Sequence, residues 1–241
     1  MDCTKRSFTW KLVFTVIVSA FGCSVQFYHC GILNNPQNII ERWINESYLQ
    51  RNIILSQAGL TQIMSFTISA TALGAMIGSI FTRFYVDVLG RRDGLILNGI
   101  SNVVASILMG AAKSANLPEL LILGRILVGI NLGTASGVVP MYITEIAPVR
   151  YRGAFGTCHM IFVALGDLLS LIVGLPQLLG TETLWPLSTA LTGLPALLLA
   201  LSLPFCADSP RFLLTKKKDD RRAADAVKFF LGEQNVDTVM K

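Results

Sequence analysis

Long apolar runs separated by short polar segments dominate the 241-residue sequence. A helix needs about 20 predominantly apolar residues to cross a bilayer. Six runs are long enough: residues 10–33, 60–83, 94–112, 119–143, 154–175 and 185–205. Because lipid offers no hydrogen-bond partner to an open backbone, we predict that all six are helices. The pattern therefore predicts an all-α membrane protein with a six-helix transmembrane bundle within residues 10–205.

Polar segments make up the rest of the chain. Residues 1–9 precede the bundle, residues 34–59 form the one long connection within it, and residues 206–241 follow it. The first run is too long and too polar at its end for a cleaved signal peptide, so we treat it as a retained helix. In the last segment, apolar residues at roughly helical spacing predict a short amphipathic helix against the bundle or the lipid surface: Ala223, Ala224, Val227, Phe229 and Leu231.

Composition agrees with a membrane protein. Hydrophobic residues make up 52% of the sequence and charged residues 15%, whereas a soluble domain carries about a quarter charged residues. The five cysteines lie in the helices or near the predicted cytoplasmic side, and they form no disulfide framework. We find no metal-spaced His/Cys cluster, no phosphate-binding glycine loop and no nucleophile with a base, so we predict neither an enzyme nor a cofactor.

Lysine and arginine lie mostly on one side of the predicted bundle. Fifteen of the twenty are on the side of the two termini, and three, Arg42, Arg51 and Lys113, are on the other. The positive-inside rule therefore places both termini in the cytoplasm and residues 34–59 outside. This sidedness accounts for the net charge of +5 without a nucleic-acid partner. The outer segment holds the sequon Asn45-Glu46-Ser47, so we predict a glycan on Asn45.

Small residues recur every four positions in the second and fourth predicted helices. The two stripes are Ala70, Gly74 and Gly78, and Gly129, Gly133 and Gly137. Each stripe lies on one helical face. Small residues let transmembrane helices approach closely, so we predict close packing along both stripes.

Acidic and basic residues gather near the predicted cytoplasmic helix ends. We term this set the latch: Asp87, Gly90, Arg91, Arg92, Arg125, Glu145, Arg152 and Arg211. Positive-inside charge explains the arginines, but not Asp87 and Glu145 beside them. We therefore predict ion pairs, with Glu145 bound to Arg91, Arg92 or Arg152, that hold the helix ends together in one conformation and release them in another.

Several segments, in their order and spacing along the chain, carry a family resemblance: Asp87 with Gly90-Arg91-Arg92, Gly124-Arg125, Pro140-Met141-Tyr142 with Glu145, Arg152-Gly153-Ala154, Trp185-Pro186 and Asp208-Ser209-Pro210-Arg211. Over nearly its whole length the chain resembles the facilitative sugar-transporter family of the major facilitator superfamily. The segments LPQLLGTETLWP and SLPFCADSPRFLL are most similar to the fructose-type branch, which includes a urate carrier.

The resemblance implies a plasma-membrane carrier built of two six-helix halves, which enclose a substrate site at the membrane midplane and rock about it. It implies that this chain is the N-terminal half. It also implies that residues 206–241 begin a cytoplasmic linker, so we expect a truncated or partial chain. The positions that it implies for substrate contact are Gln26, Phe27, Asn34, Ser136 and Met160.

Two departures from the family pattern bear on the substrate. Sugar carriers have a glutamine where this chain has Met160, whose thioether is a weak acceptor and no donor. Asp167 shares a helical face with Met160, about 10 Å along the axis, and we predict that it faces the same cavity. The first helix is also one residue short at Tyr28-His29, and we expect local unwinding near Gly31 to absorb the difference.

Three functions remain open. The first is facilitated diffusion of a hexose, fructose or glucose, by alternating access. The second is carriage of urate or another organic anion, which Met160 and Arg83 favour and Asp167 does not. The third is a half-transporter that carries nothing itself and pairs with a C-terminal half or a full-length relative.

Overall fold

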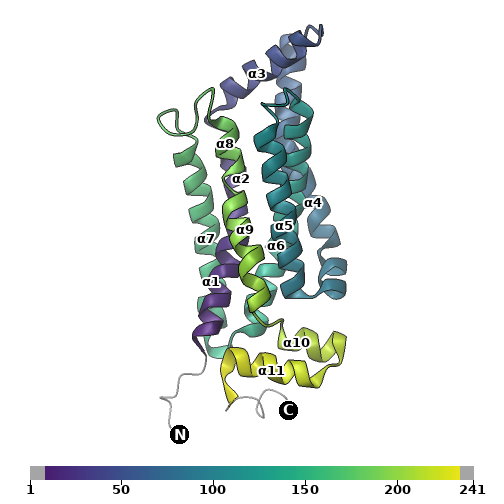
Figure 1. The fold of residues 1–241 in the computed structure, drawn as a ribbon, viewed down its shortest axis with the longest axis vertical. Helices are drawn as coiled ribbons and strands as arrows, with labels where there is room; N and C mark the ends of the chain where they lie inside the picture. Colours follow the sequence, from purple (N-terminus) through teal and green to yellow (C-terminus); the bar gives the residue numbers. More distant parts are fainter. Residues whose placement is uncertain (1–8, 234–241) are drawn as a thin grey trace.

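The computed structural model describes residues 9–233, apart from the side chains of Ser24 and Val25. Every regular element in this range is helical, which confirms the all-α prediction. Six helices are long and apolar enough to cross a membrane. In Figure 1 they stand roughly side by side, with α3 beyond one end of the bundle and α10 and α11 across the other.

The six spans agree with the predicted runs. The first comprises α1 (Trp10–Ser24), a 3₁₀ turn (Val25–Phe27) and α2 (Tyr28–Gly31), and the next three are α4 (Gln57–Leu89), α5 (Arg91–Ala111) and α6 (Pro118–Ile146). The fifth comprises a 3₁₀ turn (Val149–Tyr151) and α7 (Arg152–Val173), and the sixth comprises α8 (Trp185–Ala190), α9 (Gly193–Ser202) and a 3₁₀ turn (Leu203–Phe205). The irregular turn of the first span thus lies before Tyr28, not at Gly31 where we expected it.

The long connection between the first two spans is not simply a loop, because it contains α3 (Gln37–Gln50). The buried residues of this helix include Ile40, Trp43 and Ile44, spaced to share one face. The Trp43 ring lies 5.1 Å from that of Trp185 at the start of α8. Helix α3 therefore packs its apolar face against the bundle end opposite α11.

The two small-residue stripes pack against each other. A Cβ atom added at Gly78 would lie 2.1 Å from the carbonyl oxygen of Ile130, and one added at Gly133 would lie 2.1 Å from that of Ala75. Both distances are far below van der Waals contact, so only glycine allows these backbones to approach so closely. The predicted close packing is confirmed, and it joins α4 to α6.

The segment after the last span folds back onto the bundle. It contains α10 (Pro210–Phe212), a π-helical turn (Leu213–Lys217) and α11 (Asp220–Leu231). The buried face of α11 consists of Ala223, Ala226, Val227 and Phe230, so the predicted helix is present with a slightly rotated apolar face. The Thr9 hydroxyl donates to the carbonyl oxygen of Phe229 at 2.8 Å, which ties α11 to the start of the first span.

Candidate functional site

The centre of the latch is a buried ion pair between α5 and α6. Arg91 donates from Nε to Glu145 Oε2 at 2.9 Å and from Nη2 to Oε1 at 3.0 Å. Their side chains are only 11% and 8% exposed. A paired, bidentate geometry of this kind is both strong and directional. Glu145 thus binds one of the three arginines that the sequence offered.

The same ion pair holds the segment after the last span. The Ser209 hydroxyl donates to Glu145 Oε2 at 2.5 Å, and the Arg91 guanidinium lies 5.1 Å from the centre of the Phe212 ring. Phe212 is itself buried. One carboxylate and one guanidinium therefore join α5, α6 and α10.

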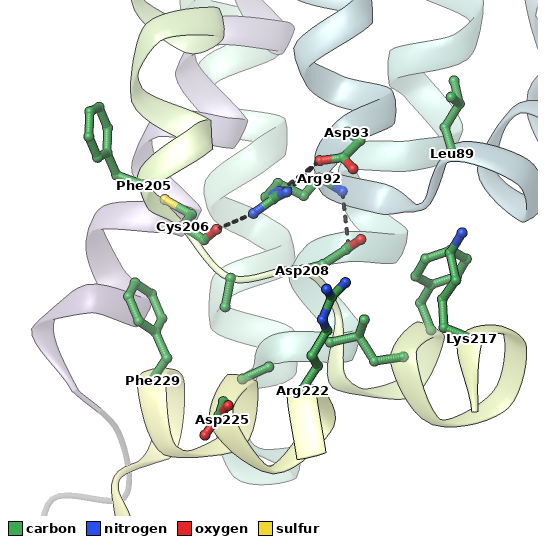
Figure 2. Close-up of a pocket in the computed structure, with 14 residues that line it drawn as sticks. Leu89, Arg92, Asp93, Phe205, Cys206, Asp208, Lys217, Arg222, Asp225 and Phe229 are labelled. Carbon is green, nitrogen blue, oxygen red and sulfur yellow. Dashed lines mark hydrogen bonds and ion pairs between the residues drawn. The ribbon is translucent and has the colours of Figure 1, made fainter. Parts of the chain in front are cut away.

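Arg92 makes a second cluster beside the first. Its backbone N–H donates to Asp208 Oδ1 at 3.1 Å, and its guanidinium donates to Asp93 at 2.8 Å and to the carbonyl oxygen of Cys206 at 3.1 Å (Figure 2). Burial raises the pKa of the Asp208 carboxyl, while the backbone N–H groups of Arg92 and Ser209 oppose that shift. Arg92 therefore binds the segment that follows the last span, and not Glu145.

Gly90 sets the geometry of both clusters. It separates α4 from α5 with φ at +95°, a backbone conformation that favours glycine. A Cβ atom there would lie 2.6 Å from Asp208 Oδ2 and 2.7 Å from the Phe212 ring. Glycine thus lets the Asp208–Phe212 segment dock beneath α5, where Arg91 reaches Glu145.

The other latch residues at this end of the bundle lie around this centre. Asp87 pairs with Lys216 at 3.1 Å on the surface, so it binds a lysine of the last segment and no arginine. Arg152 donates to the carbonyl oxygen of Ala147 at 3.2 Å, which closes the turn into α7. Arg211 is exposed on α10.

The structure does not bring Arg125 to the latch. Helix α6 starts at the opposite end of the bundle, and Arg125 lies near that start. Glu145 follows Arg125 by 20 residues along the same helix, about 30 Å away at 1.5 Å per residue. Arg125 is instead buried, and it donates to the carbonyl oxygens of His29 at 2.6 Å and Thr67 at 3.4 Å. It joins α2, α4 and α6 deep in the bundle.

The residues expected to contact substrate divide into a buried and an exposed group. Gln26 is 1% exposed and donates to Asn98 Oδ1 at 2.7 Å, while Asn98 donates to the carbonyl oxygen of Asn131. Phe27 is half-buried. Gln26 therefore lies inside this six-helix unit, in a polar seam between α5 and α6.

The exposed group lies on α6, on α7 and just after α2. Asn34, Ser136 and Asp167 are exposed, and Met160 is 64% exposed. Helix α7, which carries Met160 and Asp167 on one face, is the least buried of the six spans. Asp167 also lies close to the first span, since a Cβ atom added at Gly31 would be 3.2 Å from its Oδ1.

Several contacts were not anticipated from the sequence. Ser209 completes the latch, and a buried chain of polar side chains links His29 to Thr192 at 2.7 Å and Thr192 to Ser106 at 3.1 Å. Polar residues inside an apolar run are the signal that marks such buried networks. Within residues 9–233, no three His, Cys, Asp or Glu side chains come together as a metal site would require.

The predicted glycosylation residue lies on α3. Asn45 is half-buried, and Ser47 of the sequon is buried and donates to the carbonyl oxygen of Asn116 at 3.0 Å. Recognition of this sequon would therefore have to precede the docking of α3. Modification of Asn45 stays a prediction.

Comparisons with known sequences cover nearly the whole chain. The family described as "Sugar (and other) transporter" matches residues 15–241. The chain is 41% identical over 230 residues to mouse "Solute carrier family 2, facilitated glucose transporter member 3" and 40% identical over 232 residues to horse member 5 of that family. Each match covers 95% of this chain and 46% of the relative, so the chain spans about half the length of these relatives. The two identities do not separate the branches, and the fructose-type branch stays a prediction.

Solved structures give the same result for the fold. A proton:xylose symporter of the major facilitator superfamily, bound to 6-bromo-6-deoxy-D-glucose, superimposes with a TM-score of 0.85 at 20% identity, covering 96% of this chain and 52% of that one. A partially occluded inward-open form of the E. coli xylose transporter gives a TM-score of 0.83, also at 20% identity, covering 95% and 57%. The chain therefore belongs to the facilitative sugar-transporter family of the major facilitator superfamily, and it corresponds to the N-terminal six-helix half of that fold.

Proposed function

We propose that this chain is one half of a hexose carrier that works by alternating access, with fructose or glucose as substrate. A second six-helix half, covalently continuous or contributed by a partner, completes the substrate site. The family match and the similarity of the two named relatives support hexose transport.

The exposed carboxylate on α7 is the observation that carries the proposal. Asp167 lies within a membrane span, on the same exposed face as Met160. A charged side chain in a span faces protein or a water-filled cavity and not lipid, because its desolvation in hydrocarbon costs at least about 3 kcal/mol. This face of α7 is therefore expected to meet the second half or to line the cavity between the halves.

The latch gives the moving part of such a carrier a rigid cytoplasmic end. The Arg91–Glu145 pair and Ser209 tie α5, α6 and α10 into one body. Rocking of one half against the other needs bodies that move as units. The latch is therefore proposed to hold these helix ends together as one body in one conformation and to release them in another, which changes the side of the membrane to which the cavity opens.

Sidedness follows from the charge distribution. We propose that α10 and α11 lie in the cytoplasm and α3 outside, in the plasma membrane. Replacing Asn45 by glutamine is then expected to remove a glycosidase-sensitive mass shift. Labelling of Lys228 on α11 from outside intact cells would show that the orientation is inverted.

The substrate class is tested on α7. Met160→Gln adds a donor and an acceptor for a sugar hydroxyl, and one such bond contributes about 0.5–1.5 kcal/mol, or roughly two- to tenfold in affinity. Hexose uptake should therefore rise. Asp167→Asn keeps the size of the side chain and removes its charge, so it should favour an anion such as urate more than a neutral sugar.

Each variant is expressed together with a complementary second six-helix half, and uptake of labelled fructose, glucose and urate is compared at matched surface expression. If neither substitution changes the ratio among the three, α7 does not contact the substrate. Uptake of urate and of no hexose by the unmodified chain in this pairing would instead favour the organic-anion carrier, which the sequence favours because Met160 replaces a glutamine. Surface expression without uptake of any of the three would favour a non-transporting half that acts by pairing.

A further inference from the structure

The turn between α10 and α11 presents a threonine at the surface beside three lysines. Thr215 lies in the π-helical turn Leu213–Lys217 at the end of the bundle where α10 and α11 lie (Figure 1), and Lys216, Lys217 and Lys218 follow it. All four residues are exposed. The turn ends at Lys218 with φ at +53°, a left-handed conformation that is unfavourable for a lysine. The hydroxyl of Thr215 is therefore carried by a short, accessible segment that is no part of a regular helix.

Thr215 also lines a cavity of about 560 Å³. The turn that joins α6 to α7 lies on one side of this cavity, and α10 and α11 lie on the other. It shares no lining residue with the cluster around Arg92. Its charged lining consists of Glu145, Arg152 and Arg211, and most of the remaining lining is apolar. The cavity therefore brings the hydroxyl of Thr215 together with two arginines that come from different elements.

The two arginines are available to an anion, whereas the carboxylate is already paired. Glu145 is bound by both nitrogens that Arg91 offers it. Arg152 donates to a backbone carbonyl oxygen through Nε, so its two terminal nitrogens remain for another acceptor. The exposed Arg211 side chain has no ion-pair partner within residues 9–233. The unpaired charge of the cavity lining is therefore positive.

Arg211 lies one helical turn before Thr215. The Thr215 hydroxyl donates to the Arg211 carbonyl oxygen at 2.8 Å, and residues four apart on a helical turn are neighbours on one face. A phosphate on this hydroxyl carries a charge of about −1.5 to −2 and three strong acceptor oxygens. Guanidinium groups bind phosphate through two parallel N–H donors, so Arg211 is a suitable first partner.

We propose that Thr215 is a phosphorylation site, and that its phosphate binds Arg211 on α10 and Arg152 across the cavity. A protein kinase that selects basic residues after its target transfers the γ-phosphoryl group of ATP. A bond forms between Thr215 Oγ1 and phosphorus, the bond between phosphorus and the departing ADP oxygen breaks, and the hydroxyl proton passes to the kinase. The phosphate then ties α10 to the start of α7, beside the Arg91–Glu145 pair, so the modification strengthens the latch. In the cell the inference rests on the proposed orientation, since the kinase and ATP act on the cytoplasmic side.

Kinase treatment of the purified chain tests the proposal independently of orientation, which the glycan and labelling experiments test separately. The chain in detergent micelles is incubated with MgATP and a serine/threonine kinase of this specificity, and the modified residue is located by fragment mass spectrometry. We expect phosphate on Thr215, and Thr215→Ala should abolish it. Thr144→Ala is the matched control, because Thr144 is exposed and lines the same cavity but is followed by Glu145 and not by lysines. This control should leave phosphorylation of Thr215 unchanged.

Hydrogen exchange of the turn between α6 and α7 measures the proposed tie. The backbone amides of residues 147–151 are not themselves modified, and they should exchange about tenfold more slowly after phosphorylation, as expected for one charge-assisted hydrogen bond. Arg152→Gln should remove this gain without preventing phosphorylation. Arg150→Gln should retain the gain, because Arg150 does not line the cavity.

Each variant is compared with its own unphosphorylated form, so a general loss of stability does not affect the comparison. Absence of phosphate from Thr215 would overturn the proposal. So would exchange of the turn that is equal before and after phosphorylation, or an equal gain in Arg152→Gln and the unmodified chain.

Discussion

Replacing Glu145 by glutamine tests how firmly the latch holds the segment with α10 and α11 to the bundle. The substitution keeps the size of the side chain and its hydrogen bond from Ser209, but it leaves the Arg91 guanidinium without its counter-ion. Removing one partner of a buried pair costs about 3–5 kcal/mol. The Arg91 and Glu145 side chains are still 11% and 8% exposed. We therefore expect the substitution to destabilise the docked segment by about 3 kcal/mol, the lower end of that range.

The same surface supplies a matched control. Asp87 and Lys216 also join the last segment to the bundle, but their side chains are 36% and 49% exposed. Water and salt screen such a pair, so Asp87→Asn should cost about 0–1 kcal/mol. Both substitutions remove one carboxylate charge and conserve shape. The difference between them therefore measures burial of the ion pair.

Limited trypsin digestion of the purified protein reports the effect through the basic residues between α10 and α11. Cleavage needs an extended chain, so its rate follows the fraction of molecules in which this segment has come away from the bundle. A loss of 3 kcal/mol raises that fraction about a hundredfold, and 1 kcal/mol raises it about fivefold. Equal cleavage rates for Glu145→Gln and Asp87→Asn would refute the assignment of the Arg91 pair as the main tie.

Two further predictions concern packing and pH. Gly133→Ala places a Cβ atom 2.1 Å from the Ala75 carbonyl oxygen and should destabilise the protein by about 1–3 kcal/mol. Gly156→Ala is the control, because a Cβ atom there has nothing within 4 Å and should not destabilise the protein. Equal melting temperatures of the two variants in detergent would contradict the close packing of α4 against α6. Burial raises the pKa of Asp208 above its ordinary value of 3.8. The stability linked to this carboxyl is therefore fully present below pH 3.8, and it is lost as the pH rises through the raised pKa. Trypsin protection of the last segment should fall over that interval, and Asp208→Asn should remove this part of the pH dependence; an unchanged profile would show that Asp208 does not titrate there.

The six membrane spans were predictable because hydrophobicity is a local property of the chain. Helix α3 was missed because only one face of it is apolar, and such a segment is hard to distinguish from a polar loop by hydropathy. The residues Ile40, Trp43 and Ile44 carry its helical spacing, and they mark it once that spacing is examined.

The latch was predictable as a group, but its pairs were not. Three arginines lie near Glu145 in the sequence pattern, and the choice of Arg91 depends on the turn at Gly90 and on Ser209 and Phe212, which come from a distant segment. Arg125 was grouped with the latch because its Gly-Arg pair opens an apolar run. The direction of that helix, which starts at the bundle end opposite the latch, separates Arg125 from Glu145.

The candidate substrate residues show a further limit of sequence reasoning. Gln26 and Asp167 are both polar residues within apolar runs, yet the structure buries Gln26 against Asn98 and exposes Asp167. Helical periodicity places a residue on a face, but packing of the neighbouring helices decides whether that face is covered. In the proposed carrier, residues of the second half would also contribute to the site.

Hexose uptake by complementary halves tests the central claim most directly. Cells express this chain alone, the second six-helix half of the horse relative alone, or the two together, with surface levels matched, and uptake of radiolabelled fructose and glucose is followed over time. The account predicts saturable uptake of at least one hexose by the combination, and none above background by either half. No hexose uptake by a combination that co-purifies as a complex at the cell surface would contradict it.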